Sequence, residues 1–259
     1  MKKEKYQEYN GLFGDAVDYQ VYHMSKKEIL LGALMGIAAG GVITFIYFNI
    51  VILTLICIPF CAVGGVVIFK NILLEGRKKK LLFQFRDMLE SVSSSLGSGQ
   101  NVNHAFHGAL NDLTSQYGEE AYIVEELKII NRGITSNIRI EKLLQDFAKR
   151  SHNENVQNFA DVFFVANKRG GDIRQVIFET KNVINEKIMV EQDIQTLISG
   201  KKNELNIMML LPLIVVNQTK AMQGNSAEDA VLNFIVKLIA FGMFGIAYVI
   251  GQKMMKIEV

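Results

Sequence analysis

Cysteine is scarce in this sequence, and its two cysteines, Cys57 and Cys61, exclude two kinds of structure. They lie about one helical turn apart inside an apolar run, so they offer no disulfide framework. A metal centre would need more ligands than these two thiols. We therefore expect both to be small packing residues that face a neighbouring helix.

An excess of charge of either sign is also missing. The chain has 28 Lys and Arg residues against 26 Asp and Glu residues, for a formal net charge of +2. This charge is too small to favour a nucleic-acid partner. The basic run "RKKK" at residues 77–80 lies close to a long apolar segment, and such clusters are attracted to anionic lipid headgroups. We expect contact with a lipid bilayer and none with nucleic acid.

Catalytic and metal-binding signatures are missing as well. The sequence has no HExxH and no Cys-x-x-Cys motif, and Ser93, Ser94 and Ser95 lack the His and Asp arrangement that marks a nucleophile. His104 and His107 share a helix face, but no third zinc ligand is identifiable, so we expect two solvated histidines. The sequence predicts no enzyme, no cofactor and no metal site.

Two long apolar runs stand out instead, at residues 29–48 and 50–69, with only Asn49 between them. Each is about 20 residues long, and a helix of that length rises ~30 Å, the hydrocarbon thickness of a bilayer. The single residue between the runs leaves room only for a tight turn. We therefore predict a transmembrane hairpin over residues 29–69.

Basic residues flank both outer ends of this hairpin. Lys26 and Lys27 precede the first run and Lys70 follows the second. Because basic flanks stay on the cytoplasmic side, the turn is expected outside. Residues 1–28 are then a cytoplasmic N-terminal arm.

The last part of the chain turns apolar again. We predict a third span at residues 205–222, an external loop at 223–230, a fourth span at 231–251 and a cytoplasmic tail at 252–259, because basic residues follow the last span. Lys237 falls inside the fourth span. Its stem can snorkel toward the interface, or it can be a functional intramembrane charge; both interpretations stay open.

The middle of the chain, residues 70–204, has the composition of a soluble domain and carries six amphipathic stripes at helical spacing. No alternating run indicates a strand. We predict an all-α membrane protein with an N-terminal transmembrane hairpin, a six-helix cytoplasmic bundle and two C-terminal transmembrane helices. The stripes are Phe85, Met88, Leu89, Val92 and Leu96; Val102, Ala105, Phe106, Ala109, Leu110 and Leu113; Ile123, Val124, Leu127, Ile130 and Ile134; Ile140, Leu143, Leu144 and Phe147; Val156, Phe159, Ala160 and Phe163; and Ile173, Val176, Ile177, Thr180, Val183, Ile184, Ile188, Ile194, Leu197 and Ile198.

Three breaks between the stripes share one pattern. Each begins with Gly or Asn, the residues that best tolerate the left-handed conformation that ends a helix, and has apolar residues three, six and seven positions later. We interpret all three as corners between helices. They comprise Gly99, Val102, Ala105 and Phe106; Asn137, Ile140, Leu143 and Leu144; and Gly170, Ile173, Val176 and Ile177.

The third corner, "KRGGDIRQ", raises the alternative of a phosphate-binding loop. Such a loop would need a buried strand before it and a Gly-Lys-Ser or Gly-Lys-Thr end, and the segment has neither. We therefore favour a helical hairpin with Gly170 and Gly171 at its turn. Lys168 and Arg169 complement the negative end of one helix dipole, and Asp172 caps the next helix.

The order of these elements resembles a known family. The segments "FRDMLESVSSSLGSGQNVNHAF", "FADVFFVANKRGGDIRQVI" and "MMLLPLIVV" are similar to the F-domain family of type II secretion systems, and more narrowly to the TadB-like or TadC-like proteins of Flp/Tad pilus assembly. The similarity covers about residues 80–220. Its motifs are structural patterns and contain no catalytic signature.

The resemblance implies a platform protein of the inner (cytoplasmic) membrane. Such a protein couples a cytoplasmic assembly ATPase to the extraction of pilin subunits from the membrane. The chain has one F domain where the classical platform has two, which implies that a second chain, identical or paralogous, completes the platform. The candidates for contact with the ATPase are Lys168, Arg169 and Arg174.

Two other functions remain as alternatives. A membrane-anchored helical sensor or adaptor would use the bundle to bind a signalling partner. A polytopic membrane enzyme or transporter would need intramembrane acids or metal ligands, and the sequence offers only Lys237 and two cysteines. Neighbouring genes for a pilus ATPase and for prepilins would argue against both.

Overall fold

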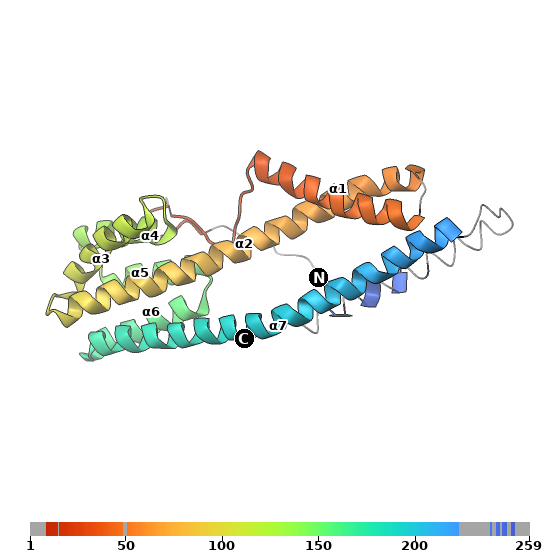
Figure 1. The fold of residues 1–259 in the computed structure, drawn as a ribbon. Helices are drawn as coiled ribbons and strands as arrows, with labels where there is room; N and C mark the ends of the chain where they lie inside the picture. Colours follow the sequence, from red (N-terminus) through yellow and green to blue (C-terminus); the bar gives the residue numbers. More distant parts are fainter. Residues whose placement is uncertain are drawn as a thin grey trace. The chain divides into compact units, whose positions relative to one another are not determined.

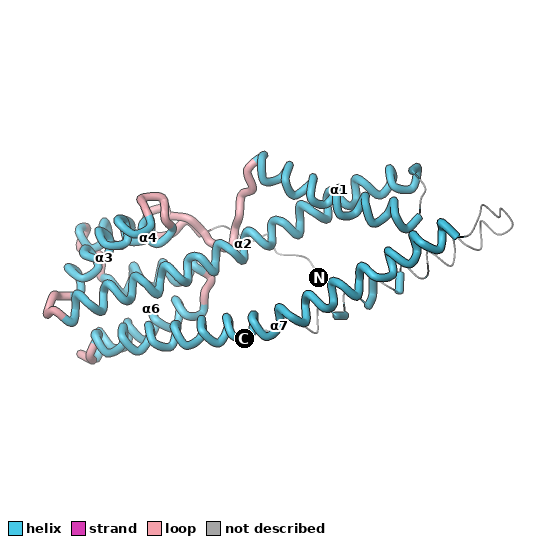
Figure 2. Tube along the Cα trace, viewed as in Figure 1, coloured by secondary structure: helices cyan, strands magenta, loops and turns pink. Residues whose placement is uncertain are grey.

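The computed structural model describes residues 9–14, 16–48, 51–222, 239, 242–243, 245–247 and 250–251. These residues form helices and connecting loops and contain no strand (Figure 2), which confirms the all-helical prediction for this part of the chain. The helices in order are α1 (Lys26–Phe48), α2 (Val51–Gly97), α3 (Val102–Tyr117), α4 (Tyr122–Thr135), α5 (Ile140–Ser151), α6 (Glu154–Arg169) and α7 (Ile173–Met222).

The chain divides into two compact units. Residues 1–23 and 71–188 form the first, which we call the bundle unit, and residues 24–70 and 189–259 form the second, which we call the span unit. Helices α2 and α7 each contribute residues to both units. No helix end lies at residues 69–70 or 204–205, where the change in composition suggested boundaries between spans and bundle.

The bundle unit is built from the second part of α2, from α3 to α6 and from the first part of α7 (Figure 1). Phe85 of α2 lies near its centre, with its ring centroid 6.0 Å from that of Phe147 on α5 and 5.6 Å from that of Phe159 on α6. All three rings are almost completely buried. Burial of one such side chain stabilises a fold by about 1.5–3 kcal/mol.

Five of the six predicted stripes line this core, with every member buried or half-buried. The sixth stripe is confirmed only in part. Ile177, Ile184 and Ile188 are buried, but Val183 and Leu197 are 59% and 77% exposed. Leu197 lies beyond Ile188, where the contribution of α7 to the bundle unit ends, whereas Val183 lies within that contribution and is exposed all the same.

Helix ends fall where the sequence breaks are. Asn101 precedes α3 and accepts a hydrogen bond from the backbone N–H of His104, and Asn153 precedes α6 and accepts one from Asn155. Each side chain satisfies an N–H that has no partner within its helix. Helix α5 continues through Ser151, and Asn153 is the residue that caps α6.

In the span unit, α1 packs closely against the first part of α2 (Figure 1). A Cβ atom on Gly36 would lie 2.3 Å from the carbonyl oxygen of Cys61, and one on Gly65 would lie 2.5 Å from that of Gly32. A Cβ on Gly40 would lie 2.3 Å from the sulfur of Cys61. Glycines spaced by four on α1 thus allow the two backbones to approach, and Cys61 is a packing residue at this contact.

Two helical segments of the described residues are long and apolar enough to cross a membrane, Lys26–Thr44 in α1 and Leu55–Gly97 in α2. The predicted turn at Asn49, the external loop at 223–230 and the tail at 252–259 lie outside the described residues, as does most of the predicted fourth span with Lys237. The predicted third span falls within α7, which continues to Met222.

Candidate functional site

The N-terminal arm carries side chains into the interior of the bundle unit. Asp18 and Tyr19 are fully buried and Ala16 is nearly so. The ring of Tyr19 packs edge-on against Tyr122 of α4, with 5.9 Å between the ring centroids. The backbone N–H of Tyr19 donates to the carbonyl oxygen of Arg150 at 3.0 Å. The arm is therefore a folded part of the bundle unit and not a loose leader to the first span.

Arg150 of α5 is the centre of this docking site. Its two terminal nitrogens each donate to one oxygen of Glu126 on α4, at 2.6 Å, and its Nε donates to Asp146 at 2.9 Å. The three side chains are 1%, 1% and 5% exposed. Asp146 and Arg150 are four residues apart, which places them on one face of α5. Arg150 also donates to the carbonyl oxygen of Val17 in the arm, at 3.3 Å.

Arm tyrosines complete the bonding of the two buried carboxylates. The hydroxyl of Tyr19 donates to Glu126 at 3.0 Å, and that of Tyr9 donates to Asp146 at 2.8 Å. An arginine that binds both oxygens of a carboxylate forms one of the stronger interactions available to that carboxylate when it is buried. We call Tyr9, Tyr19, Glu126, Asp146 and Arg150 the arm-docking network.

The network shifts the pKa values of Tyr19, Glu126 and Arg150. Burial raises the pKa of Tyr19 well above its usual value, and the nearby Glu126 raises it further. Burial also raises the pKa of Glu126, against the opposing effect of Arg150 and of the Tyr19 hydroxyl. Burial alone would lower the pKa of Arg150, but its two carboxylate partners outweigh burial and raise it. Arg150 is therefore a permanent cation, suited to holding an element in place and unsuited to proton transfer.

A second cation holds the arm from α2. The guanidinium of Arg77 lies over three aromatic rings, with its carbon 4.8 Å from the centroid of Tyr19, 5.3 Å from Tyr122 and 5.9 Å from Tyr22. Its Nη1 donates to the carbonyl oxygen of Val21 at 3.1 Å. A cation–π contact contributes from about 0.5 kcal/mol at an exposed site to about 2 kcal/mol when it is desolvated. Arg77 thus differs from a solvated member of a basic run, since it is enclosed by rings from the arm and α4.

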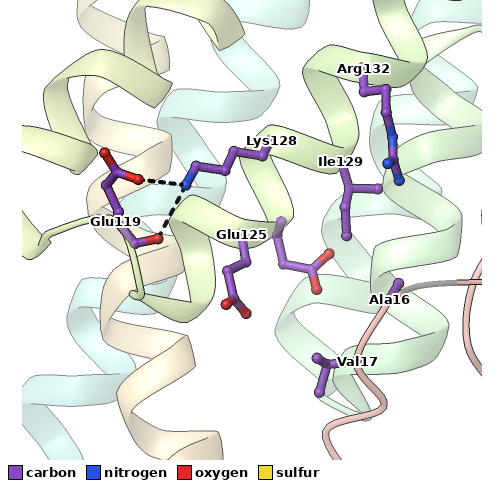
Figure 3. A pocket seen from close by; sticks show the side chains of 8 residues that line it. Ala16, Val17, Glu119, Glu125, Lys128, Ile129 and Arg132 are labelled. Carbon is purple, nitrogen blue, oxygen red and sulfur yellow. Dashed lines mark hydrogen bonds and ion pairs between the residues drawn. The ribbon is translucent and has the colours of Figure 1, made fainter.

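Beside the network, an open pocket of about 400 Å³ lies between the arm and α4 (Figure 3). Lys128 extends across it and pairs with Glu119, at 3.5 Å to the carboxylate and 3.4 Å to the backbone carbonyl. Glu126 also lines the pocket, but both of its oxygens are bound by Arg150. Of the acidic side chains here, Glu126 therefore has little capacity left for a ligand. The lining residues are Ala16, Val17, Glu119, Glu125, Glu126, Lys128, Ile129 and Arg132.

The three corner motifs lie in three separate turns. Gly99, Asn137 and Gly170 all have positive φ, at 89°, 56° and 69°. The apolar members that follow are buried or half-buried: Ala105 and Ile140 are buried, whereas Val102 and Ile173 are half-buried.

In the third corner only Gly170 needs the left-handed conformation; Gly171 does not have it. A Cβ on Gly171 would lie 3.3 Å from the carbonyl oxygen of Ala166, which is a tight contact. Asp172 accepts from the backbone N–H of Gln175 at 3.2 Å, as expected for an N-terminal cap.

The remaining candidates are surface residues. Lys168, Arg169 and Arg174 are exposed on either side of the α6–α7 turn and belong to no part of the arm-docking network. His104 and His107 are exposed on α3. Among the described residues, no three or more His, Cys, Asp or Glu side chains gather so that they could hold a metal ion.

Sequence reasoning missed the arm-docking network, although one signal for it was present. Glu126 lies three residues after Ile123 and four before Ile130, which places a carboxylate on an apolar stripe. Asp146 and Arg150 interrupt the stripe of α5 in the same way. A charged residue on a buried face needs a partner of opposite charge. Pairing these residues across helices was possible, but nothing in the sequence identified Tyr9 and Tyr19 as their ligands.

The arrangement can clamp one segment to another, and it offers no reacting centre among its members. Comparison with known proteins adds nothing to this picture: no family model, no curated protein and no solved structure matches the chain.

Proposed function

We propose that this chain is an inner-membrane platform protein of a Tad/Flp-type pilus or of a type II secretion-like machine, TadB-like or TadC-like, and that it couples a cytoplasmic ATPase to pilin assembly. It is not an enzyme in this proposal. Its partners are the assembly ATPase, pilin subunits, the lipid bilayer and a second F-domain protein, which is either another copy or a paralogue.

The corner pattern carries the proposal. Three turns of one helical unit begin with a residue of positive φ, Gly99, Asn137 or Gly170, and each is followed by apolar residues at the same three spacings. This unit adjoins two candidate membrane helices in the chain. A helical domain that repeats one corner and is joined to membrane spans is the combination that the sequence resemblance implies.

The chain connections support a role in transmitting movement. In our topology α1 and the first part of α2 form the transmembrane hairpin, the bundle unit is cytoplasmic, and two C-terminal spans follow. The bundle unit is then joined to the membrane by α2, by α7 and by the arm, which leads into α1 at Lys26. The arm-docking network fixes the third of these connections, because it holds residues 16–19 within the bundle unit.

One experiment tests this role directly. In the source organism, in-frame deletion of the gene should abolish surface pilin while the cellular pool of pilin persists in the membrane. Expression of the full chain from a plasmid should restore surface pilin. Normal surface pilin in the deletion strain, with no change in secreted proteins, would remove the platform function.

A membrane-anchored sensor or adaptor is the second candidate, and the docked arm is the observation that favours it. A segment clamped to a domain by a discrete network can be released by a signal. The deletion strain separates the two functions: a sensor would change gene expression or signalling while assembled pili persist, whereas a platform protein is required for the pili themselves.

A further inference from the structure

One exposed face of α6 has the properties of a contact surface. Val162 and Val165 are 50% and 46% exposed, and with Ala166 they line an open groove of about 440 Å³. Asp161 lies at one end of this row and Arg169 toward the other. No core residue of α6 is among these side chains, because α6 buries Val156, Phe159, Ala160 and Phe163 on its other side. We call Asp161, Val162, Val165, Ala166 and Arg169 the α6 face.

The charges of the α6 face are arranged symmetrically about one residue. Asp161, Val165 and Arg169 are spaced by four, so they form one continuous row along the helix, with the acid and the base each about 6 Å from the centre. Reversing the direction of such a row exchanges the positions of its two charges. A row of this kind is therefore complementary to an antiparallel copy of itself.

We propose that the α6 face is the contact through which two copies of this chain pair, with a two-fold axis at Val165. The two-fold axis makes the row of one copy run antiparallel to the row of the other. Asp161 of one copy then lies beside Arg169 of the other, twice by symmetry, and the valines fill the space between them. Such an isologous contact closes on itself and leaves no open end.

The interactions within one chain leave both charges available. The carboxylate of Asp161 accepts only the side-chain amide of Gln157, at 3.0 and 3.1 Å, and an amide does not neutralise its charge. Within the described part of the chain, neither Asp161 nor Arg169 takes part in an ion pair. A second copy supplies the missing opposite charge to each.

The pairing does not depend on the function proposed above, although a platform that needs two F domains would use it. The α6 face is small, and small interfaces give weak complexes. Capture by a covalent link in the membrane is therefore the suitable measurement. If Val165 lies on the axis, Val165→Cys places two identical thiols opposite each other. Helices packed 8–10 Å apart bring such Cα atoms within the range that a disulfide requires.

The experiment uses the full chain in native membranes, with mild oxidation and separation of disulfide-linked dimers on a non-reducing gel. Gln116→Cys, on the exposed surface of α3, is the matched control, and the parent chain gives the background from Cys57 and Cys61. V165C should form dimers well above both. Circular dichroism of each purified variant verifies that its helices are intact.

Charge reversal then tests the pairing of the ends. In the V165C background, Asp161→Arg or Arg169→Asp alone should lower the dimer yield at least ~5-fold, because like charges then meet across the contact. The two reversals together should restore the yield. Three results would each overturn the proposal. They are a dimer yield of V165C no higher than that of Q116C, a dimer yield that D161R does not change, and no recovery of the yield in the double reversal. D161R leaves the cations proposed to meet the ATPase unchanged, so its effect is distinguishable from loss of that partner.

Discussion

Of the substitutions possible in the arm-docking network, replacement of Arg150 by methionine is expected to destabilise the fold most. The change keeps an unbranched side chain of similar length but removes both hydrogen bonds to Glu126, the one to Asp146 and the one to Val17. Two carboxylates then remain buried without a cation. Removing one partner of a buried ion pair typically costs 3–5 kcal/mol. For a domain of this size, we expect a fall in melting temperature of about 10 °C or more.

The pH dependence of this loss has a definite sign. Without Arg150, burial raises the folded-state pKa of Glu126 above its unfolded value, so the protonated form is favoured in the fold. Such a group stabilises the fold fully below its unfolded pKa, and this contribution is lost as the pH rises through the folded pKa. The difference in melting temperature between Arg150→Met and the parent should therefore be smaller at pH 5 than at pH 7.5.

The assay is thermal unfolding of the full chain in detergent, followed by far-ultraviolet circular dichroism. Arg139→Met, at an exposed position just before α5, is the control and should change stability by no more than about 0.5 kcal/mol. Ala16→Cys reports on the arm itself. A cysteine at this nearly buried position should react slowly with a maleimide when Arg150 is present, and rapidly when A16C is combined with R150M. A melting temperature within 2–3 °C of the parent and no gain in labelling would refute a buried network that holds the arm.

Four further predictions concern the rest of the chain. Gly36→Leu should disrupt the close contact of α1 with α2, because its Cβ alone would lie 2.3 Å from a carbonyl oxygen. Thermal aggregation of the purified protein should then begin at a lower temperature. Gly41→Leu, at a position where a Cβ meets nothing within 4 Å, should have a small effect. Gly170→Val should cost ~1–3 kcal/mol because it forces a β-branched residue to φ 69°, and chemical unfolding that shows no loss would contradict this. Burial and the hydrogen bond to Asp87 raise the pKa of Tyr117 to about 12, so its contribution to stability is complete below pH 10 and is lost as the pH rises toward 12. Tyr117→Phe should therefore remove one high-pH step from the tyrosine absorbance titration. Reporter fusions should be active in the cytoplasm at residue 120 and outside at residue 225, and an external signal at residue 120 would reverse the topology.

The bundle core was predictable because it depends on residue patterns within each helix. Burial of Phe85, Phe147 and Phe159 follows from apolar residues at helical spacing, and the helix ends follow from Gly and Asn at the breaks. The continuity of α2 was less evident, since the composition changes sharply near Lys70. Helix propagation depends on backbone hydrogen bonds and not on hydrophobicity, so a change from apolar to polar residues need not interrupt the helix.

The arm-docking network was not predictable from the same patterns. Tyr19 and Glu126 are 107 residues apart, and Tyr9 and Asp146 are 137 apart. No periodicity within the arm indicates that it folds against α4 and α5, because the arm has no regular secondary structure between residues 16 and 25. The only local signal was the misplaced charge on each apolar stripe, and it shows that a partner is required without identifying the partner.

The platform role is tested most directly by co-purification of the full chain with its cognate assembly ATPase from gently solubilised membranes. We predict that the parent protein retains the ATPase, and that the triple variant with Lys168, Arg169 and Arg174 changed to Glu loses it while keeping the circular dichroism spectrum and membrane insertion of the parent. The single variant R139M provides the control for surface charge and should retain it. Retention by the triple variant would move the contact away from the α6–α7 turn, and failure of the parent chain to retain any assembly ATPase would contradict the platform function itself.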